Sequence, residues 1–346
     1  MENEPKRLSA PASEQIRLDA PIGRGARGFL VFLICCAVLV AAFAVSRIWA
    51  GRRPNEERRT DTGEEAQAGD TTVPQADGRD TTPDDPLPDG AVAIRAADLS
   101  GKGIRNETAY RIDPDAMRTE LEVGSAAYSP DEPIVLILHT HAQEGYRPDG
   151  TPYLTGSVGD AIYTDDPSAG VVAAGDALRQ ALVRGGVPTI HCTDVHGKNG
   201  TLRGSYASAA DCIRAYLKQY PSIQYVIDLH RDGILASDGA CVRTLSEGGS
   251  AQIMAVVGSD GGGESCPAWR ENLSLALLLS ERLNTASEGI SRPVSLRNAT
   301  YNQELAPHSL LLEIGSAGNT VEEAKSAAAL AGEVLADLLC GRSAGR

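Results

Sequence analysis

Two histidines and a glutamate lie close together in the segment "ILHTHAQEGY", residues 137–146. Only six histidines occur in the chain, and His139 and His141 are two of them, with Glu144 three residues beyond the second. Imidazole nitrogens and carboxylates are ligands that zinc takes from proteins. If the chain turns after Thr140, His141 and Glu144 converge as an H-x-x-E metal pair. His139 either replaces His141 as a ligand or orients it.

A third histidine has an equivalent position later in the chain. The segment "IDLHRDG", residues 227–233, carries His230 at the end of a predicted strand. Because the carboxyl ends of parallel strands open at one edge of a sheet, His230 is expected to join His141 and Glu144 around one Zn²⁺ ion, with a fourth position open. Zinc held in this way lowers the pKa of bound water toward about 7 and polarises an amide carbonyl.

Such a site also needs a group that accepts a proton. The last predicted strand contains "LLLEIG", residues 310–315, with Glu313 in an otherwise apolar run. An unpaired carboxylate is costly to bury, so its place in a strand indicates a function. Glu313 can take a proton from the attacking water and return it to the leaving amine. Arg231 and Arg297 are the candidates for stabilising the developing oxyanion.

Other residues of the same types are interpreted as structural. His191, Cys192 and Asp194 lie at the end of a predicted strand and are expected to be structural, with support of the metal ligands as the alternative; His196 and His308 are assigned to loops. The glycine run at 260–263 lacks the spacing and the Lys-Ser/Thr pair of a phosphate-binding loop. It is therefore expected to be a plain loop.

From residue 131 onward, short apolar runs alternate with helical patterns. The predicted strands are 133–138, 187–191, 223–229, 252–257, 294–296 and 310–314. The predicted helices are 169–184, 205–219, 269–284 and 321–339, the last capped by Thr320 with Glu322 and Glu323 in its first turn. This alternation predicts an α/β layered domain with a mainly parallel sheet flanked by helices.

Before this domain, the composition changes twice. Residues 28–46 contain no charge and are long enough, with the following residues to 50, to span a bilayer. Residues 28–50 are therefore predicted to be one transmembrane helix, although Ala42-Phe43-Ala44 also resembles the cleavage site of a signal peptide. Basic residues are balanced on the two sides. The N-terminus is placed inside because a short tail, 1–27, precedes one long domain.

Residues 51–90 are polar, rich in Asp, Thr and Pro, and are predicted to be a disordered linker. Residues 91–130 are expected to form a lead-in segment of mixed pattern, and 131–341 are expected to form the domain that carries the zinc site. A formal net charge of −14, from 32 Lys and Arg against 46 Asp and Glu, argues against nucleic acid as a partner.

Four cysteines fall in the predicted domain: Cys192, Cys212, Cys241 and Cys266. If the domain is outside the cytoplasm, they can form disulfides. Pairing Cys192 with Cys212 and Cys241 with Cys266 is one of three connectivities. Four buried free thiols are the alternative. The absence of a C-x-x-C pair disfavours a zinc finger.

Longer motifs carry a resemblance to a known family. The segments "ILHTHAQEGY", "GSYASA", "DLHRDG", "PAWRENLSLALLL" and "RPVSLRNATYNQELAPHSLLLEIGSAGNTVEEA" resemble the stage II sporulation protein P family of endospore-forming bacteria, over residues 105–340. The resemblance implies a membrane-anchored, zinc-dependent peptidoglycan hydrolase related to N-acetylmuramoyl-L-alanine amidases, with endopeptidase activity on peptide crosslinks also attributed to it. The "LLEIG" segment with Asn319 is similar to the amidase motif that bears the catalytic glutamate, which points to Glu313.

The resemblance also implies a cellular setting. It places the protein in the cell membrane, with its catalytic domain in the space between the mother-cell and forespore membranes during engulfment. Sporulation proteins D and M are the implied membrane partners. This chain departs from the family where His-Pro-Asn-Trp is replaced by Cys266-Pro267-Ala268-Trp269, which removes a substrate contact or adds a disulfide.

Two readings from other classes compete with the enzyme. A non-catalytic wall-binding or scaffold subunit with the same fold predicts binding of cell-wall sacculi without cleavage. A metal amidohydrolase of small acyl-amino acids has a soluble substrate and needs neither an anchor nor a long tether.

Overall fold

The computed structural model describes residues 91–92, 95–97, 99–101, 103–120, 128–148, 153–154, 163–197, 202, 204–234 and 241–342. The predicted membrane span at 28–50 and the predicted linker at 51–90 lie outside them. Among the residues that are described, no helix has the length and apolar character needed to cross a bilayer.

A seven-stranded sheet runs through the described domain in the order β3-β10-β9-β11-β7-β4-β6. Its neighbouring strands are all parallel except β9 and β11, which pair antiparallel. The bounds are β3 Ile104–Asn106, β4 Val135–Leu138, β6 Thr189–His191, β7 Tyr225–Asp232, β9 Ile253–Gly258, β10 Val294–Arg297 and β11 Ser309–Ser316. The predicted α/β class with a mainly parallel sheet is confirmed.

The single antiparallel pairing divides the sheet into two halves. β11, β7, β4 and β6 run one way, and β9, β10 and β3 run the other. The carboxyl ends of the first group therefore open at one edge, and those of the second group open at the opposite edge. Side chains at the ends of β4, β7 and β11 can meet, whereas a residue at the end of β10 is directed away from them.

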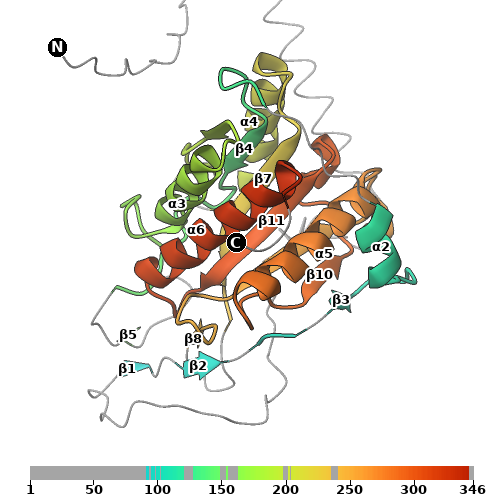
Figure 1. Cartoon of the computed structure of the whole chain (residues 1–346). Coiled ribbons are helices and arrows are strands. Elements are labelled where there is room, and N and C mark those ends of the chain that lie inside the picture. Colours follow the sequence, from blue (N-terminus) through green and yellow to red (C-terminus); the bar gives the residue numbers. More distant parts are fainter. Residues whose placement is uncertain are drawn as a thin grey trace, which may run out of the picture. The chain divides into compact units, whose positions relative to one another are not determined.

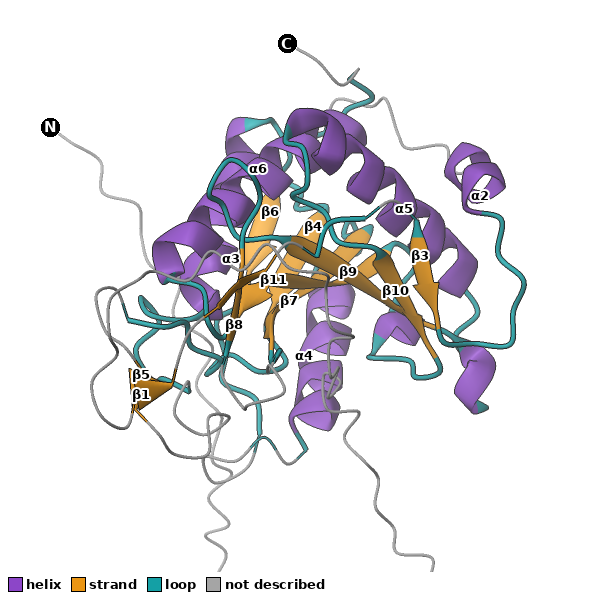
Figure 2. Cartoon of the chain, turned by 90° about the horizontal axis from the view of Figure 1, so that it is seen from below, coloured by secondary structure: helices purple, strands orange, loops and turns teal. Residues whose placement is uncertain are grey.

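Helices cover both faces of the sheet (Figures 1 and 2). On one face lie α3 Val171–Arg184, α5 Trp269–Ala286 and α6 Val321–Leu339, and on the other lies α4 Ser205–Gln219. The larger core, between the sheet and the first group, includes Leu178, Leu273 and Leu335. A smaller core under α4 includes Leu136, Ile213 and Val226. Because helices cover both faces of the sheet, successive residues of a central strand are buried on one face or the other, and the strand sequences are therefore continuous apolar runs.

The start of α6 follows the prediction closely. The Thr320 side chain accepts a hydrogen bond from the Glu323 amide, and the Glu323 side chain accepts one from the Thr320 amide, which completes a capping box. Further along, α6 packs tightly on α3 at Gly332, where an added Cβ would lie 2.6 Å from the Ala181 Cβ atom. Small side chains on both helices allow this close approach.

Part of the lead-in segment belongs to the domain. Strand β3 forms an edge of the sheet beside β10, and α2 Pro114–Glu120 packs against α5. The remaining described elements are short: β1 Ala91–Val92 pairs with β5 Tyr153–Leu154, β2 Arg95–Ala97 pairs with β8 Val242–Thr244, and η2 Asp260–Gly262 and η3 Gln303–Leu305 are single 3-10 turns. The glycine run at 260–263 thus forms a short turn rather than a phosphate cradle.

All of the described cysteines are free thiols. Neither disulfide of the connectivity considered above, Cys192–Cys212 or Cys241–Cys266, is present, which agrees with the alternative of free thiols, although Cys212 is only half-buried. Cys266 is buried in the larger core and its carbonyl accepts a hydrogen bond from the Trp269 amide at the start of α5. In this chain the departure from the family motif thus gives a packing residue and no cross-link.

Candidate metal centre

A turn after β4 brings the first two metal-ligating side chains together. The strand ends at Leu138, and the amide of Glu144 then donates a hydrogen bond to the carbonyl of His141 at 3.0 Å. His141 Nδ1 lies 3.3 Å from Glu144 Oε1 as a result. The expected convergence of the H-x-x-E pair is present. The strand ends before His139, and the His139 ring contacts other residues, the Leu229 carbonyl and His191.

His230 joins this pair from the carboxyl end of β7. Its Nδ1 atom lies 3.3 Å from the other oxygen of Glu144, and its ring centroid is 5.0 Å from that of His141. The ligand atoms of His141, Glu144 and His230 all lie within 4.8 Å of one another. All three side chains are buried. The three predicted ligands therefore form one compact group, which we call the His-Glu-His group.

The electrostatics of the His-Glu-His group favour a positive charge at its centre. Burial raises the pKa of Glu144, but the charge of His230 and hydrogen bonds from His141 and His230 outweigh it and hold the pKa well below its usual range. Burial likewise lowers the pKa of His230, but Asp228 and Glu144 together raise it well above 6.5. The carboxylates thus retain a proton on His230 when no other cation is close. A divalent ion would replace that proton.

The surroundings of the two histidine rings test whether a metal ion fits. His141 Nε2 and His230 Nε2 are buried without a hydrogen-bond partner. His230 Nε2 nevertheless lies 2.9 Å from Asp228 Oδ1, at ion-pair distance. The two Nδ1 atoms face one carboxylate, and two imidazoles with one carboxylate are a donor set typical of zinc. The residues present fit a divalent metal ion.

Asp228 was not predicted as part of the site. Its carboxylate accepts hydrogen bonds from the Thr140 amide at 2.8 Å and the Thr140 hydroxyl at 2.6 Å, which fixes it beside His230. A carboxylate behind a ligating histidine orients the ring and makes it more basic. The sequence signal that identified Glu313, a charge inside an apolar strand, also applies to Asp228 and would have found it.

Glu313 lies next to the His-Glu-His group on β11. It is paired in register with His230 on the neighbouring parallel strand, and paired residues of parallel strands project to the same face. One oxygen, Oε2, is buried without a partner. Burial, together with the charge of Asp232, raises the pKa of Glu313 to about 8. A carboxyl group in this state can hold and release a proton near neutral pH.

Arg231 also lies at the group, directly after His230. Its amide donates a hydrogen bond to Glu144 Oε2 at 3.1 Å, and its Nε atom donates one to the Gly145 carbonyl at 3.1 Å. The guanidinium is stacked over the ring of Tyr163 at 5.4 Å. Arg231 therefore orients the Glu144 carboxylate and brings a fixed positive charge beside it.

His139 is directed away from the group, beneath α3. Its Nδ1 atom bonds the Leu229 carbonyl at 2.7 Å, and its Nε2 atom lies 2.7 Å from Nε2 of His191. His191 in turn contacts the Asp176 carboxylate of α3 at 3.0 Å. His139 is therefore placed to support β7 next to His230, and the alternative in which it replaces His141 as a ligand does not match this geometry.

Two other predicted residues lie elsewhere. The amide of Asn319 is fully engaged in holding β8 and the start of α6, through bonds with Thr244 and Glu323. Arg297, at the end of β10, pairs with Glu107 at 2.7 Å. Its strand runs opposite to β11, so Arg297 lies toward the other edge of the sheet. The structure brings neither side chain to the His-Glu-His group.

The fold and the group define the class of the chain: an α/β protein with a buried His-Glu-His arrangement that can hold a divalent metal ion. The family model described as "Stage II sporulation protein P (SpoIIP)" matches residues 53–336. The chain belongs to the stage II sporulation protein P family.

A curated relative of that name, from Bacillus subtilis (strain 168), is 30% identical over 218 residues, which are 60% of this chain and 51% of the relative. The chain thus matches about half the length of this relative. Among solved structures, the N-acetylmuramyl-L-alanine amidase Ami1 of Mycobacterium smegmatis is 16% identical over 61% of this chain and 99% of its own, with a TM-score of 0.36. The CwlD amidase of Clostridioides difficile, solved with the GerS lipoprotein, is 15% identical over 60% of this chain and 98% of its own, with a TM-score of 0.39. These scores are too low for the likeness to bear on what the chain does.

Proposed function

We propose that this chain is a zinc-dependent peptidoglycan hydrolase that cleaves the amide bond between N-acetylmuramic acid and L-alanine. The observation that carries the proposal is the convergence of His141, Glu144 and His230 with Glu313 on the adjacent strand. Membership of the sporulation family supports the cell wall as the substrate. Peptide crosslinks are a second amide substrate that we assign to the same site.

Different residues of the chain bind the metal ion, transfer the proton and stabilise the developing charge. A zinc ion held by the His-Glu-His group would lower the pKa of water and polarise the substrate carbonyl. Glu313 accepts the proton of the attacking water at its free Oε2 atom and delivers it to the nitrogen of the leaving amine. Arg231 supplies fixed positive charge where the oxyanion develops. Asp228 holds His230 in one orientation throughout.

The cellular setting is part of the proposal. Residues 28–50 anchor the chain in the cell membrane with the N-terminus inside, and residues 51–90 tether a catalytic domain outside the cytoplasm, between the mother-cell and forespore membranes. The chain acts during engulfment of the forespore, together with sporulation proteins D and M. A tethered domain suits an insoluble substrate that lies at a distance from the membrane.

Digestion of purified sacculi by the full-length chain tests the proposal. Muramidase treatment of the products, followed by chromatography and mass spectrometry, separates stem peptides released from glycan from crosslinks that have been cut. We expect Glu313→Gln to lower the rate by about 10²- to 10⁴-fold, the contribution of a general acid-base, with zinc retained. Glu322→Gln, an exposed glutamate that pairs with Lys325, is the matched control and should digest sacculi at the wild-type rate. Sacculus binding without cleavage, unaffected by a chelator, would show a scaffold subunit instead.

A further inference from the structure

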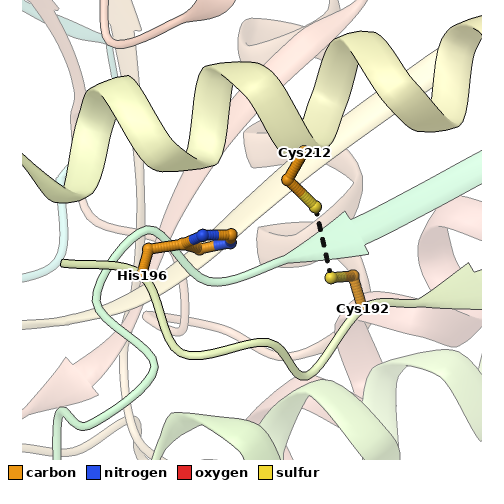
Figure 3. Close-up of side chains that lie close together, drawn as sticks. All are labelled: Cys192, His196 and Cys212. Atoms are coloured by element: carbon orange, nitrogen blue, oxygen red, sulfur yellow. Dashed lines mark hydrogen bonds between the residues drawn. The ribbon is translucent and has the colours of Figure 1, made fainter. Parts of the chain in front are cut away.

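A second group of metal-ligating side chains lies apart from the first. Cys192 follows β6, His196 lies in the loop beyond it, and Cys212 is on α4 (Figure 3). Their ligand atoms lie within 4.8 Å of one another. We call these residues the Cys-His-Cys group. None of them takes part in the chemistry proposed above.

The spacing of the two sulfurs suits a shared metal ion. Cys192 Sγ and Cys212 Sγ are 3.4 Å apart (Figure 3). A disulfide requires about 2.05 Å between sulfurs. Two thiolates on one tetrahedral zinc ion, each about 2.3 Å from it, are separated by roughly 3.8 Å. The observed separation is closer to the second value.

His196 provides the observation that distinguishes a metal site from a reduced disulfide. Its ring is buried, and its Nδ1 atom bonds the Ser208 hydroxyl at 3.2 Å. Its Nε2 atom is buried without a partner. When the Nδ1 atom of a histidine donates its hydrogen, Nε2 carries the lone pair that binds metals. Ser208 and Cys212 lie four residues apart on α4 and so share a face. The bond to Ser208 therefore holds His196 on the face that also carries Cys212.

We propose that Cys192, His196 and Cys212 form a second, structural zinc site. Thiolate and imidazole ligands select zinc among the common divalent ions, and two thiolates neutralise the charge of the ion. The group supplies three ligands, and because Cys212 is half-buried, water could reach a fourth position on a bound ion.

The site would fasten α4 to the loop after β6. The first turn of α4 carries Tyr206, whose ring lies 5.5 Å from the ring of His141. The Tyr206 carbonyl also accepts a hydrogen bond from Asn302 at 2.8 Å. A metal ion at the Cys-His-Cys group would therefore restrain the helix whose first turn contacts one ligand of the first site.

Cobalt substitution in the full-length chain tests the proposal, because only a thiolate-ligated Co²⁺ ion gives a near-ultraviolet charge-transfer band and the His-Glu-His group contains no cysteine. We expect the band in the wild type and in His141→Ala, and its loss in Cys192→Ser. In His196→Ala the band should weaken by at least half. Cys340→Ser, which alters another half-buried cysteine, is the control and should keep the band unchanged.

Metal analysis of the same proteins gives an independent count. We expect two zinc ions per wild-type chain, and one in His141→Ala and in Cys192→Ser, with circular dichroism showing that each variant is folded. A sulfur band that survives Cys192→Ser would overturn the proposal. So would a reduced wild-type chain without the band, or a Cys192–Cys212 disulfide that forms in the zinc-loaded chain. The proposed hydrolase activity would stand or fall separately, because it depends on the other group.

Discussion

The substitution Asp228→Asn tests whether a carboxylate behind His230 prepares the site for a metal ion. It keeps the size of the side chain and removes its charge. His230 Nε2 lies 2.9 Å from Asp228 Oδ1, and Thr140 holds that carboxylate through two hydrogen bonds. A residue in this position contributes about 10- to 100-fold to metal affinity. That range corresponds to about 1.4–2.7 kcal/mol of binding free energy.

Competition with a chromophoric chelator would measure the zinc affinity. The chain should carry Cys192→Ser and Cys212→Ser, so that only the His-Glu-His group contributes. The matched control is Asp337→Asn, which removes a carboxylate that pairs with Arg342 at 2.6 Å, near the end of α6 and away from the group. We expect weaker zinc binding in Asp228→Asn and none of this loss in the control. Equal affinities for wild type and Asp228→Asn, with both folded, would refute the orienting role of Asp228.

The buried imidazole of His139, the α3–α6 contact and the cap of α6 give three further predictions. Burial lowers the pKa of His139 to about 3, so the unfolded chain, whose histidine titrates near about 6.5, binds the proton first as the pH falls. The contribution of neutral His139 to the free energy of unfolding is therefore full above about pH 6.5 and is lost as the pH falls toward 3, by about 2 kcal/mol at pH 5. Urea titrations at several pH values should show this loss in the wild type and not in His139→Gln. Parallel plots of stability against pH for the two proteins would contradict it. Gly332→Ala should lower the melting temperature. Its new Cβ atom would lie 2.6 Å from the Ala181 Cβ and 2.7 Å from the Leu178 carbonyl oxygen, and this overpacking costs about 1–3 kcal/mol, against the ~1 kcal/mol gained in helix propensity. An unchanged melting temperature would show that α3 and α6 move apart without cost. Thr320→Ala removes one half of the capping box and should lower the free energy of unfolding, measured by urea denaturation, by about 1 kcal/mol. An unchanged free energy of unfolding would mean that the cap does not stabilise α6.

The helices were predictable from the sequence because their signals are local. The predicted helix at 205–219 matches α4 and the one at 321–339 matches α6. Thr320 with a glutamate three residues later is sufficient to locate the start of α6. Strand direction is different, since no local pattern encodes it. The antiparallel pairing of β9 with β11 depends on the path of the whole chain, and it moves Arg297 to the far edge.

The site was partly predictable for the same reason. His141 and Glu144 meet through a turn of four residues, and His230 and Glu313 follow from their places on strands that pair in register. His139 was harder, because its ring contacts the Leu229 carbonyl and His191, and these contacts depend on how β4, β6 and β7 pack together. The sequence did not predict the Cys-His-Cys group, because the group forms only if the face of α4 that carries Cys212 packs toward the loop after β6. The spacing of cysteines and histidines along the chain does not report that rotation.

The most direct test of the account is the position of a metal ion in the chain. Anomalous diffraction at the zinc edge, from crystals grown with zinc, would locate it. We predict a peak about 2.0–2.2 Å from Nδ1 of His141, Nδ1 of His230 and one oxygen of Glu144. Crystals without a peak between these atoms, or with one of the three side chains beyond bonding distance of the ion, would contradict the central claim.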